Sequence, residues 1–459
     1  MPAADAVSRR TALGLMAAAP ALAGRTSPPN VVLFVADDLG YGDISCYGCP
    51  DIRTPNVDAI AARGVRFANF YSNAPDCSPT RSALMTGRYQ HRIGGLECAI
   101  GTGNVGRYDD AEWLAARHDL GLPTSEISMP RIFKNAGYDA GCFGKWHLGY
   151  EEKFSPNAHG FDEYFGILGG NADYFTHRED EKDGAPMLYH NRTPVERKGY
   201  TTDLFAEEAV KWLKQRPHGK PFFLYLPFNA PHTPIQDPDE YDPKTNTAPR
   251  RQGNRKVYAK MVERMDRRIG DVLGQLDAMG ASDRTIVIFH SDNGGDGNGR
   301  NGPWRGRKGA AWEGGIHVPC VMRWPGVLPA GKTVEQVSIT MDLLPTLIAG
   351  AGVAAPPGRR FDGINLLPAL TGGRKPFART LFWRGKRGGR VRKAVRDGDM
   401  KLVLDPEGDE LHDLAKDPGE RKNLLPEAAA TAGRLREKLA AWEREVMAPR
   451  LRPFRTTPG

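Results

Sequence analysis

The chain has 459 residues, of which 40% are hydrophobic, and a formal net charge of +8. This length and composition allow a full hydrophobic core and indicate one large domain with a smaller one beside it. No stretch of 18 apolar residues occurs, so the sequence predicts no stable insertion in a membrane. The positive charge suits polyanionic ligands, but the cations are spread along the chain without interleaved aromatic residues, which argues against nucleic-acid binding.

Residues 1–28 have the pattern of an export signal. Ser8-Arg9-Arg10 precedes a short apolar run over residues 11–23, and Ala21-Leu22-Ala23 is a small-x-small cleavage pattern. Paired arginines at this position are typical of a bacterial twin-arginine signal, and an ordinary secretory signal is the alternative. We therefore expect an exported protein, either periplasmic or secreted.

Apolar runs alternate with helical patterns along residues 29–355, which we expect to form the main domain. In chain order, we expect a strand at 31–35, a helix at 54–64, a strand at 65–70, a helix ending at 136, a strand at 138–143, a helix at 202–215, a strand at 222–226, a helix at 256–279 and a strand at 285–289. This alternation predicts right-handed crossovers and strands buried on both faces. The predicted fold class is therefore α/β, a large mixed and mostly parallel sheet flanked by helices.

The pattern changes near residue 355. Ala355-Pro-Pro-Gly358 is typical of a linker, and short strand candidates follow at 380–383 and 400–404 before a final helix at 426–446. Residues 356–459 are therefore predicted to form a smaller C-terminal subdomain, an antiparallel sheet with one helix.

Polar residues follow several of the predicted strands. Asp37 and Asp38 come directly after the first strand, and Asp292 and Asn293 follow the strand at 285–289. His147 and His232 also follow strands. Active sites of open α/β sheets lie beyond the carboxyl ends of the strands, so we expect these side chains to converge at one edge.

The chain has six cysteines, too few for a disulfide-stabilised scaffold of this size. Cys46-x-x-Cys49 is interpreted as either a local disulfide or two free thiols. Cys77 precedes Ser78-Pro79, which suits the first turn of a helix running to Thr86, so Cys77 is predicted to stand at a helix N-terminus. Unpaired N–H groups and the helix dipole favour an anion there. Taken alone, Cys77 would be interpreted as a small buried apolar residue.

The twelve residues from Cys77 to Arg88, CSPTRSALMTGR, resemble the sulfatase signature Cys-x-Pro-x-Arg and its continuation. The resemblance extends in order through further motifs: Asp37-Asp-Leu-Gly-Tyr-Gly42, Thr54-Pro-Asn-Val-Asp58, Gly144-Lys-Trp-His-Leu-Gly149, Ala230-Pro-His-Thr-Pro234, Ser291-Asp-Asn-Gly294, Lys308-Gly-Ala-Ala-Trp-Glu-Gly-Gly315 and Glu410-Leu-His-Asp-Leu414. The chain is thus identified as a member of the sulfatase family of the alkaline phosphatase superfamily, near its arylsulfatase and N-acetylgalactosamine-6-sulfatase types.

The resemblance implies that Cys77 is oxidised to formylglycine by a maturation enzyme, and a cysteine rather than a serine implies an oxygen-dependent one. It also implies one calcium ion held by Asp37, Asp38, Asp292, Asn293 and residue 77. Calcium takes about 6–8 oxygen ligands, and magnesium is the chemical alternative.

The family mechanism assigns a role to each remaining site residue. The hydrated aldehyde of residue 77 attacks sulfur with help from Asp292, while Arg81, Lys145 and Lys308 neutralise the sulfate oxygens. His232, together with Lys308, protonates the departing alcohol. His147 then removes a proton from the second hydroxyl, so that the covalent sulfo-enzyme intermediate releases sulfate.

The expected activity is calcium-dependent, exo-acting hydrolysis of sulfate esters on carbohydrates, as in the degradation of sulfated polysaccharides. Aryl sulfates are further candidate substrates, endo action is the alternative to exo action, and the sugar position and the oligomeric state are left open. Residues 98–128 and 171–177 are candidate pocket loops, in which Trp113, Tyr174 and His177 either contact a sugar or pack internally. The alternatives are a phosphodiester or phosphonate monoester hydrolase of the same superfamily, and a non-catalytic protein that binds sulfated glycans.

Overall fold

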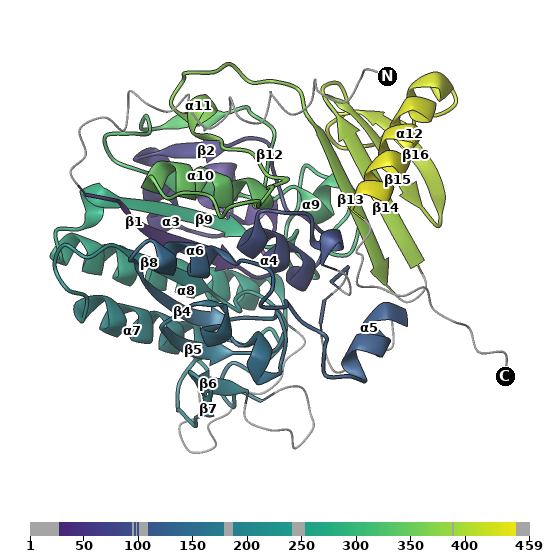
Figure 1. The fold of residues 1–459 in the computed structure, drawn as a ribbon. Helices are drawn as coiled ribbons and strands as arrows, with labels where there is room; N and C mark the ends of the chain where they lie inside the picture. The colour runs from purple at the N-terminus through teal and green to yellow at the C-terminus, as the bar shows by residue number, and fades with distance from the viewer. Residues whose placement is uncertain are drawn as a thin grey trace.

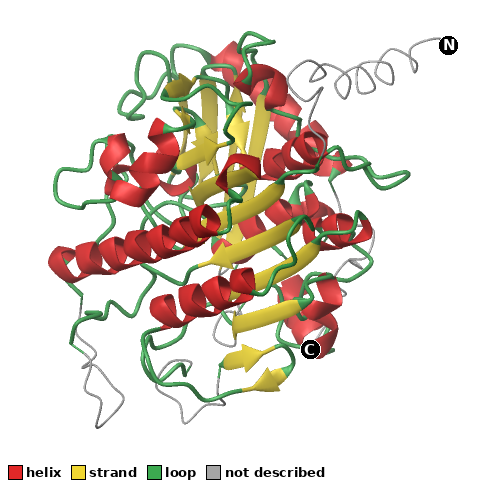
Figure 2. Ribbon diagram, turned by 90° about the vertical axis from the view of Figure 1, so that its left-hand side faces the viewer, coloured by secondary structure: helices red, strands yellow, loops and turns green. Residues whose placement is uncertain are grey.

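The structure, a computed structural model, describes residues 27–93, 96–97, 99–100, 109–178, 187–240, 253–387 and 390–446. The predicted export signal lies almost entirely outside these residues. In the described part, a ten-stranded mixed sheet forms the centre of the molecule with helices on both faces, and a smaller sheet stands beside it (Figures 1 and 2). None of the described helices is both long enough and apolar enough to cross a membrane.

The middle of the large sheet is parallel. Its strand order is β11-β2-β10-β9-β1-β8-β4-β5-β6-β7. β1 (Asn30–Ala36) pairs in parallel with β8 (Phe222–Pro227) on one side and with β9 (Thr285–Ser291) on the other. β4 (Asp139–Lys145) and β5 (Glu163–Ile167) extend this parallel group. The carboxyl ends of these five strands therefore meet at one edge of the sheet.

Antiparallel strands complete both sides of the large sheet. β10 (Cys320–Arg323) pairs antiparallel with β9 and with β2 (Val65–Phe67), and β11 (Lys332–Val334) pairs in parallel with β2. β6 (Leu188–His190) and β7 (Thr193–Pro194) form the opposite edge. The predicted fold class, a large mixed and mostly parallel sheet, is confirmed.

Alternate side chains of β1 enter two separate cores, because successive strand residues point to opposite faces. Val31, Leu33 and Val35 pack on one face. Val32, Phe34 and Ala36 pack on the other. The helices on the first face are α4 (Cys77–Thr86), α6 (Met129–Asn135) and α10 (Leu343–Ala351). Those on the second are α3 (Pro55–Ala62), α7 (Thr201–Lys214) and α8 (Arg255–Ala278). Three further short helices are described in the large domain: α5 (Asp109–Ala115), α9 (Glu313–Ile316) and α11 (Leu367–Leu370).

The prediction of one continuous strand at residues 65–70 is wrong. The expected strand at 65–70 is divided into β2 and β3 (Phe70–Tyr71), and β3 pairs with β12 (Ser338–Ile339) in a separate two-stranded sheet. The backbone exchanges partners at this point, since Ala68 donates to the carbonyl of Val334 and Ser338 donates to the carbonyl of Asn69. Apolar sequence alone does not reveal such a change of partner.

The smaller sheet is an antiparallel meander. Its strands are β13 (Thr380–Arg387), β14 (Arg390–Asp397), β15 (Met400–Asp405) and β16 (Gly408–Asp413). α12 (Ala429–Glu445) packs against it through Leu435, Leu439 and Trp442. The predicted antiparallel sheet with one helix is therefore present, although sequence patterns indicated only two of its four strands.

Candidate active site

The polar residues predicted at strand ends do lie together. Asp37 and Asp38 follow β1, and Asp292 and Asn293 follow β9, its direct neighbour. The Asp38 amide donates to Asp292 Oδ1 at 3.2 Å, and Asn293 Nδ2 donates to Asp38 Oδ1 at 2.8 Å. Asp38 has φ +62°, a conformation that is uncommon outside glycine and is often found where function holds the backbone. The sharp turn after β1 thus brings both carboxylates to the same edge.

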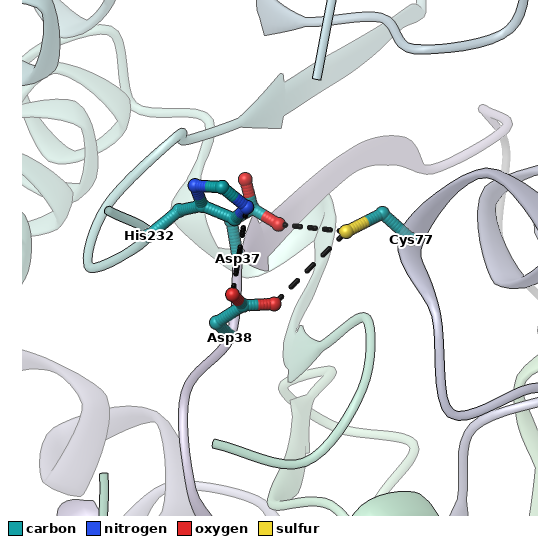
Figure 3. A group of neighbouring side chains, drawn as sticks. All are labelled: Asp37, Asp38, Cys77 and His232. Carbon is teal, nitrogen blue, oxygen red and sulfur yellow. Dashed lines mark hydrogen bonds and ion pairs between the residues drawn. The ribbon is translucent and has the colours of Figure 1, made fainter. Parts of the chain in front are cut away.

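Cys77 is the first residue of α4 and is 1% exposed. Its thiol lies 3.3 Å from Asp37 Oδ1 and 4.0 Å from Asp38 Oδ1, as Figure 3 shows. Burial, followed by the negative charges of Asp292 and Asp37, raises the pKa of the Cys77 thiol well above its usual value. The thiol is therefore protonated and is a poor nucleophile as it stands.

Arg81 stands one turn after Cys77 on α4 and is fully buried. Its guanidinium donates to Asp292 Oδ2 from Nε at 3.0 Å and from Nη2 at 2.7 Å, and Nη1 donates to the carbonyl of Lys145 at 3.0 Å. Burial opposes its charge, but Asp292 and Asp37 outweigh that effect and raise the pKa of Arg81 above its usual value. The guanidinium therefore joins the ends of α4, β4 and β9.

Two lysines from distant parts of the chain reach the same carboxylates. Lys145, the last residue of β4, places Nζ 2.5 Å from Asp37 Oδ2. Lys308 Nζ lies 2.8 Å from Asp38 Oδ2. Burial opposes the Lys308 charge, yet Asp38 raises the pKa of Lys308 well above its usual value. Burial alone would raise the pKa of Asp38, but the charges of Lys308 and His232 outweigh burial and lower the pKa of Asp38 below its usual value.

His232 also contacts the Asp38 carboxylate, with Nε2 3.5 Å from Asp38 Oδ2 (Figure 3). Its Nδ1 is 2.6 Å from the carbonyl of Thr233, so the neutral ring keeps its proton on Nδ1. Burial and the nearby Lys308 lower the pKa of His232 to about 4. His232 is therefore neutral near pH 7 before an anionic substrate arrives.

His147 enters the site from the segment after β4, with φ +56°. Its Nε2 contacts the carbonyl of Ile100, and Nδ1 has no hydrogen-bond partner in the described part of the chain. Burial, then the charge of Lys145, lowers the pKa of His147 well below its usual value. Gly170 makes room for the ring, since a Cβ at that position would lie 2.4 Å from His147 Cε1.

The site has side chains that could hold a divalent cation. Atoms of Asp37, Asp38, Cys77 and His232 all lie within 4.8 Å of one another, in a group that includes His232 rather than Asp292. The buried Asn293 Oδ1 has no hydrogen-bond partner among the described residues, which is expected of an oxygen ligand without its ion. Carboxylate and amide oxygens are the ligands that calcium prefers.

Two candidate pocket residues are instead internal. Tyr174 is fully buried, and its hydroxyl lies 2.7 Å from the carbonyl of Asn229 and 2.8 Å from that of His232. His177 is 4% exposed and contacts the carbonyl of Gly199 through Nε2. Tyr174 therefore positions the His232 segment and does not stack on a sugar. The candidate loop at 98–128 lies partly outside the described residues, and Trp113 packs under Arg117.

Sequence reasoning missed the polar cluster that supports the Lys308 segment. Glu313, five residues after Lys308, is 2% exposed and bonds to the Tyr71 hydroxyl at 2.6 Å and to Lys401 Nζ at 2.8 Å. Lys401 also lies 2.8 Å from Glu420 Oε1. The sequence did contain a signal, because Glu313 lies inside the motif that begins at Lys308. Its partners Lys401 and Glu420, however, are far away in the sequence, in the C-terminal part of the chain. Elsewhere, Cys46 and Cys49 are free thiols, which decides between the two interpretations of that pair.

Three cations, Arg81, Lys145 and Lys308, lie near residue 77 at the N-terminus of α4. This arrangement is typical of an enzyme that acts on anionic esters. The Sulfatase family model matches residues 29–353, and a model described as N-sulphoglucosamine sulphohydrolase, C-terminal, matches residues 307–445. The chain is 35% identical over 402 residues to N-acetylgalactosamine-6-sulfatase of Canis lupus familiaris, covering 84% of this chain and 74% of that protein.

Solved structures agree with this match. Ps i-CgsB, crystallised in complex with k-i-k-neocarrahexaose, superposes with a TM-score of 0.81 at 32% identity over 94% of this chain and 96% of that one. A phosphonate monoester hydrolase of Agrobacterium radiobacter shares the fold alone, with a TM-score of 0.62 at 24% identity, covering 91% of this chain and 96% of that one. The chain belongs to the sulfatase family and is a sulfuric ester hydrolase.

Proposed function

We propose that this protein hydrolyses sulfate esters on carbohydrates, with calcium and with formylglycine formed from Cys77. The observation that carries the proposal is the position of Cys77 at the N-terminus of α4, with Sγ 3.3 Å from Asp37 Oδ1 and close to buried cations. Because burial and neighbouring carboxylates keep this thiol protonated, the position needs a different nucleophile. A maturation enzyme using dioxygen would oxidise the thiol to the aldehyde, whose hydrate supplies the attacking hydroxyl.

Asp37, Asp38, Asp292 and Asn293 would hold the calcium ion, together with residue 77. The ion would supply positive charge to a bound sulfate oxygen and to the nucleophile. The three carboxylates of this group are balanced by three cations, Arg81, Lys145 and Lys308. A divalent ion would leave the pocket positive, as an anionic ester requires.

The remaining side chains bind the substrate and move protons. Lys145 forms an ion pair with Asp37, and Lys308 forms one with Asp38. The two lysines can therefore reach different non-bridging oxygens of a sulfate group. Arg81 donates two hydrogen bonds to Asp292 Oδ2 and so holds this carboxylate, which would accept the proton of the attacking hydroxyl. Burial and the charge of Asp37 raise the pKa of Asp292, which makes its carboxylate a stronger base.

The two histidines are assigned to different steps. His232 and Lys308 both reach Asp38 Oδ2, and from there His232 would share a proton with the leaving alcohol. A bound anion opposes the lowering of its pKa, because negative charge favours the protonated ring. His147 is neutral and its Nδ1 has no partner among the described residues, so it can accept the proton of a hydroxyl on residue 77 when sulfate leaves.

The carbohydrate substrate is inferred from the relatives. One is named as an N-acetylgalactosamine-6-sulfatase, and Ps i-CgsB was crystallised with a neocarrahexaose. Exo action on a terminal sulfated sugar is part of the proposal, with endo action as the alternative. Export to the periplasm or beyond is proposed from residues 8–23, and N-terminal sequencing of the natural protein tests it.

Paired chromogenic substrates test the proposal against the phosphonate alternative. We expect the mature enzyme to hydrolyse 4-nitrophenyl sulfate with a much higher kcat/KM than a 4-nitrophenyl phosphonate monoester, and to release sulfate from N-acetylgalactosamine 6-sulfate. Preference for the phosphonate would contradict it. Binding of sulfated sugars without turnover, by protein whose residue 77 is fully converted, would support a non-catalytic glycan-binding protein.

A further inference from the structure

A row of arginines lies on one face of β14. Side chains alternate along a strand, so Arg390, Arg392 and Arg396 share a face and Lys393 points to the other. Lys393 Nζ is 2.8 Å from Glu443 Oε1 on α12, so the helix covers the face opposite the arginines. Arg396 contacts the hydroxyl of Tyr71 on β3. The arginine row therefore faces the main domain, and Figure 1 shows the small sheet standing beside α9.

The three arginines differ in how fully they are paired. Arg396 is 4% exposed and is engaged with Tyr71. Arg392 is half-buried, with Nε 2.8 Å from Asp405 Oδ2 and Nη1 3.4 Å from the carbonyl of Gly309. Arg390, the first residue of β14, is exposed, and its side chain makes no hydrogen bond or ion pair with the described part of the chain. Its guanidinium is therefore available to a ligand.

Arg390 and Arg392 line a small hollow that borders the active site. On β13, the residue paired with Arg392 is Gly385, which leaves space on this face because it has no side chain. Asp76 and Gly309 also line the hollow. These are the chain neighbours of Cys77 and Lys308, so the hollow adjoins the two segments that carry these active-site residues.

The charge of this region suits an anion. The hairpin formed by residues 380–397 has seven lysines and arginines and one aspartate. Asp405 pairs with Arg392, and the charge of Asp76 adds to those of Asp38 and Asp37 in raising the pKa of Lys308. Arg390 thus supplies an uncompensated positive charge at the rim. An arginine fork binds sulfate or carboxylate oxygens in a bidentate manner.

We propose that Arg390, supported by Arg392, binds a second anionic group on the same saccharide chain, a sulfate or carboxylate of a sugar neighbouring the one that is desulfated. The substrate class is then a polyanionic saccharide rather than an isolated monosulfated sugar. This inference rests on the proposed function, because it places the scissile sulfate at residue 77. Arg390 lies outside the group around residue 77, so it acts on affinity for the longer substrate and not on the chemical step.

The test compares ligands with one and with several anionic groups. Turnover of 4-nitrophenyl sulfate is inhibited with inorganic sulfate or with a chondroitin sulfate tetrasaccharide, for wild type and Arg390→Ala. We expect Arg390→Ala to raise the inhibition constant of the tetrasaccharide by about three- to tenfold, as for one charge-assisted contact at an exposed site. The inhibition constant of inorganic sulfate, and kcat and KM for 4-nitrophenyl sulfate, should stay unchanged.

Arg434→Ala is the matched control, because it removes the same charge from an exposed position of α12, on the far side of the small sheet. Unchanged tetrasaccharide inhibition in Arg390→Ala would overturn the proposal, and so would an equal loss in Arg434→Ala. A carboxyl-reduced tetrasaccharide separates the two sources of the anion, since it keeps its dependence on Arg390 only if that group is a sulfate.

Failure of the proposed function is visible separately. Wild-type protein that does not turn over 4-nitrophenyl sulfate would contradict the sulfatase mechanism, whereas the second site is still measured by fluorescence anisotropy with labelled tetrasaccharide. In that assay, tighter binding to wild type than to Arg390→Ala supports the site. Equal affinity, or no binding to either, overturns it.

Discussion

Two groups of buried charges in this chain have similar members but differ in how completely they are paired. Around Cys77, the oxygen Oδ1 of Asn293 and the nitrogen Nδ1 of His147 lack partners in the described part of the chain. At the joint between α9 and the small sheet, Glu313 accepts from Tyr71 and Lys401, and its amide donates to Glu420 Oε2 at 2.7 Å. The first group is arranged around something it binds, and the second holds two parts of the fold together.

This contrast predicts opposite responses to perturbation. Changes around Cys77 should remove activity and leave stability nearly intact, because the site lies beyond the strand ends and outside the apolar cores. Changes at the joint should remove stability, because its charges are buried and have no water to replace a lost partner.

Removal of calcium should have the largest effect on activity. Chelation should abolish turnover, and readdition of calcium should restore it, because three carboxylates and Asn293 would lose the ion that they share. Melting temperature should fall only slightly, as the sheet does not depend on these ligands. Turnover with chelator, together with elemental analysis and circular dichroism, checks this. Full activity in protein shown to be free of metal would contradict the site.

Loss of the lysine at the joint should have the largest effect on stability. Lys401→Met leaves the buried carboxylates of Glu313 and Glu420 without their shared cation, and should lower the free energy of unfolding by about 3–5 kcal/mol. Urea unfolding followed by fluorescence measures this. Lys401→Arg keeps the charge and should lose much less. Equal stability of Lys401→Met and wild type would remove the distinction between the two groups.

The two histidines should differ in their dependence on the leaving group. His232→Ala should slow hydrolysis of an alkyl sugar sulfate by roughly 10²-fold or more, and that of activated aryl sulfates less, because poor leaving groups need a proton. His147→Ala should slow both substrates equally. A series of aryl sulfates of different leaving-group pKa measures the slope, with affinity determined separately from the chemical step. Equal slopes for His232→Ala and wild type would contradict the assignment.

The joint should also give a modest pH dependence of stability. Burial is the main effect that raises the pKa of Glu420 from 4.5 to about 7, and the negative charge of Glu313 raises it further. The folded state therefore binds this proton more tightly than the unfolded state. The resulting stability is fully present below pH 4.5 and is lost as the pH rises through about 7, on the order of 1–3 kcal/mol in total.

Glu420→Gln mimics the protonated side chain and isolates this effect. Relative to the variant, wild type should lose stability as the pH rises from 4.5 to about 7 and then stay level. Urea unfolding of both proteins at matched pH values gives the difference. Parallel curves over the whole range would show that Glu420 does not titrate there.

The sequence predicted the active site better than the joint for a physical reason. Asp37, Asp38, Asp292 and Asn293 follow apolar strands, and parallel strands bring their ends to one edge whatever their separation in the chain. The motif around Cys77 identified the family directly. By contrast, the pairing of Glu313 with Lys401 depends on how the small sheet docks, and no periodic pattern encodes that contact.

Side-chain direction was also outside the reach of sequence. Tyr174 lies in a segment that was expected to be a pocket loop, yet its hydroxyl turns inward to the carbonyls of Asn229 and His232. The division of residues 65–70 into β2 and β3 arises from a change of hydrogen-bond partner, which apolar composition does not record. Local pattern thus predicted where polar residues stand, but not which of them face the substrate.

The central claim is that residue 77 works as formylglycine. The most direct measurement is the mass of the proteolytic peptide containing residue 77, compared with specific activity toward 4-nitrophenyl sulfate, in protein made with and without a formylglycine-generating enzyme. We predict that activity rises in proportion to the fraction of aldehyde at residue 77, and that wholly unconverted protein is inactive although folded. Full activity in protein whose Cys77 thiol is intact would contradict the account.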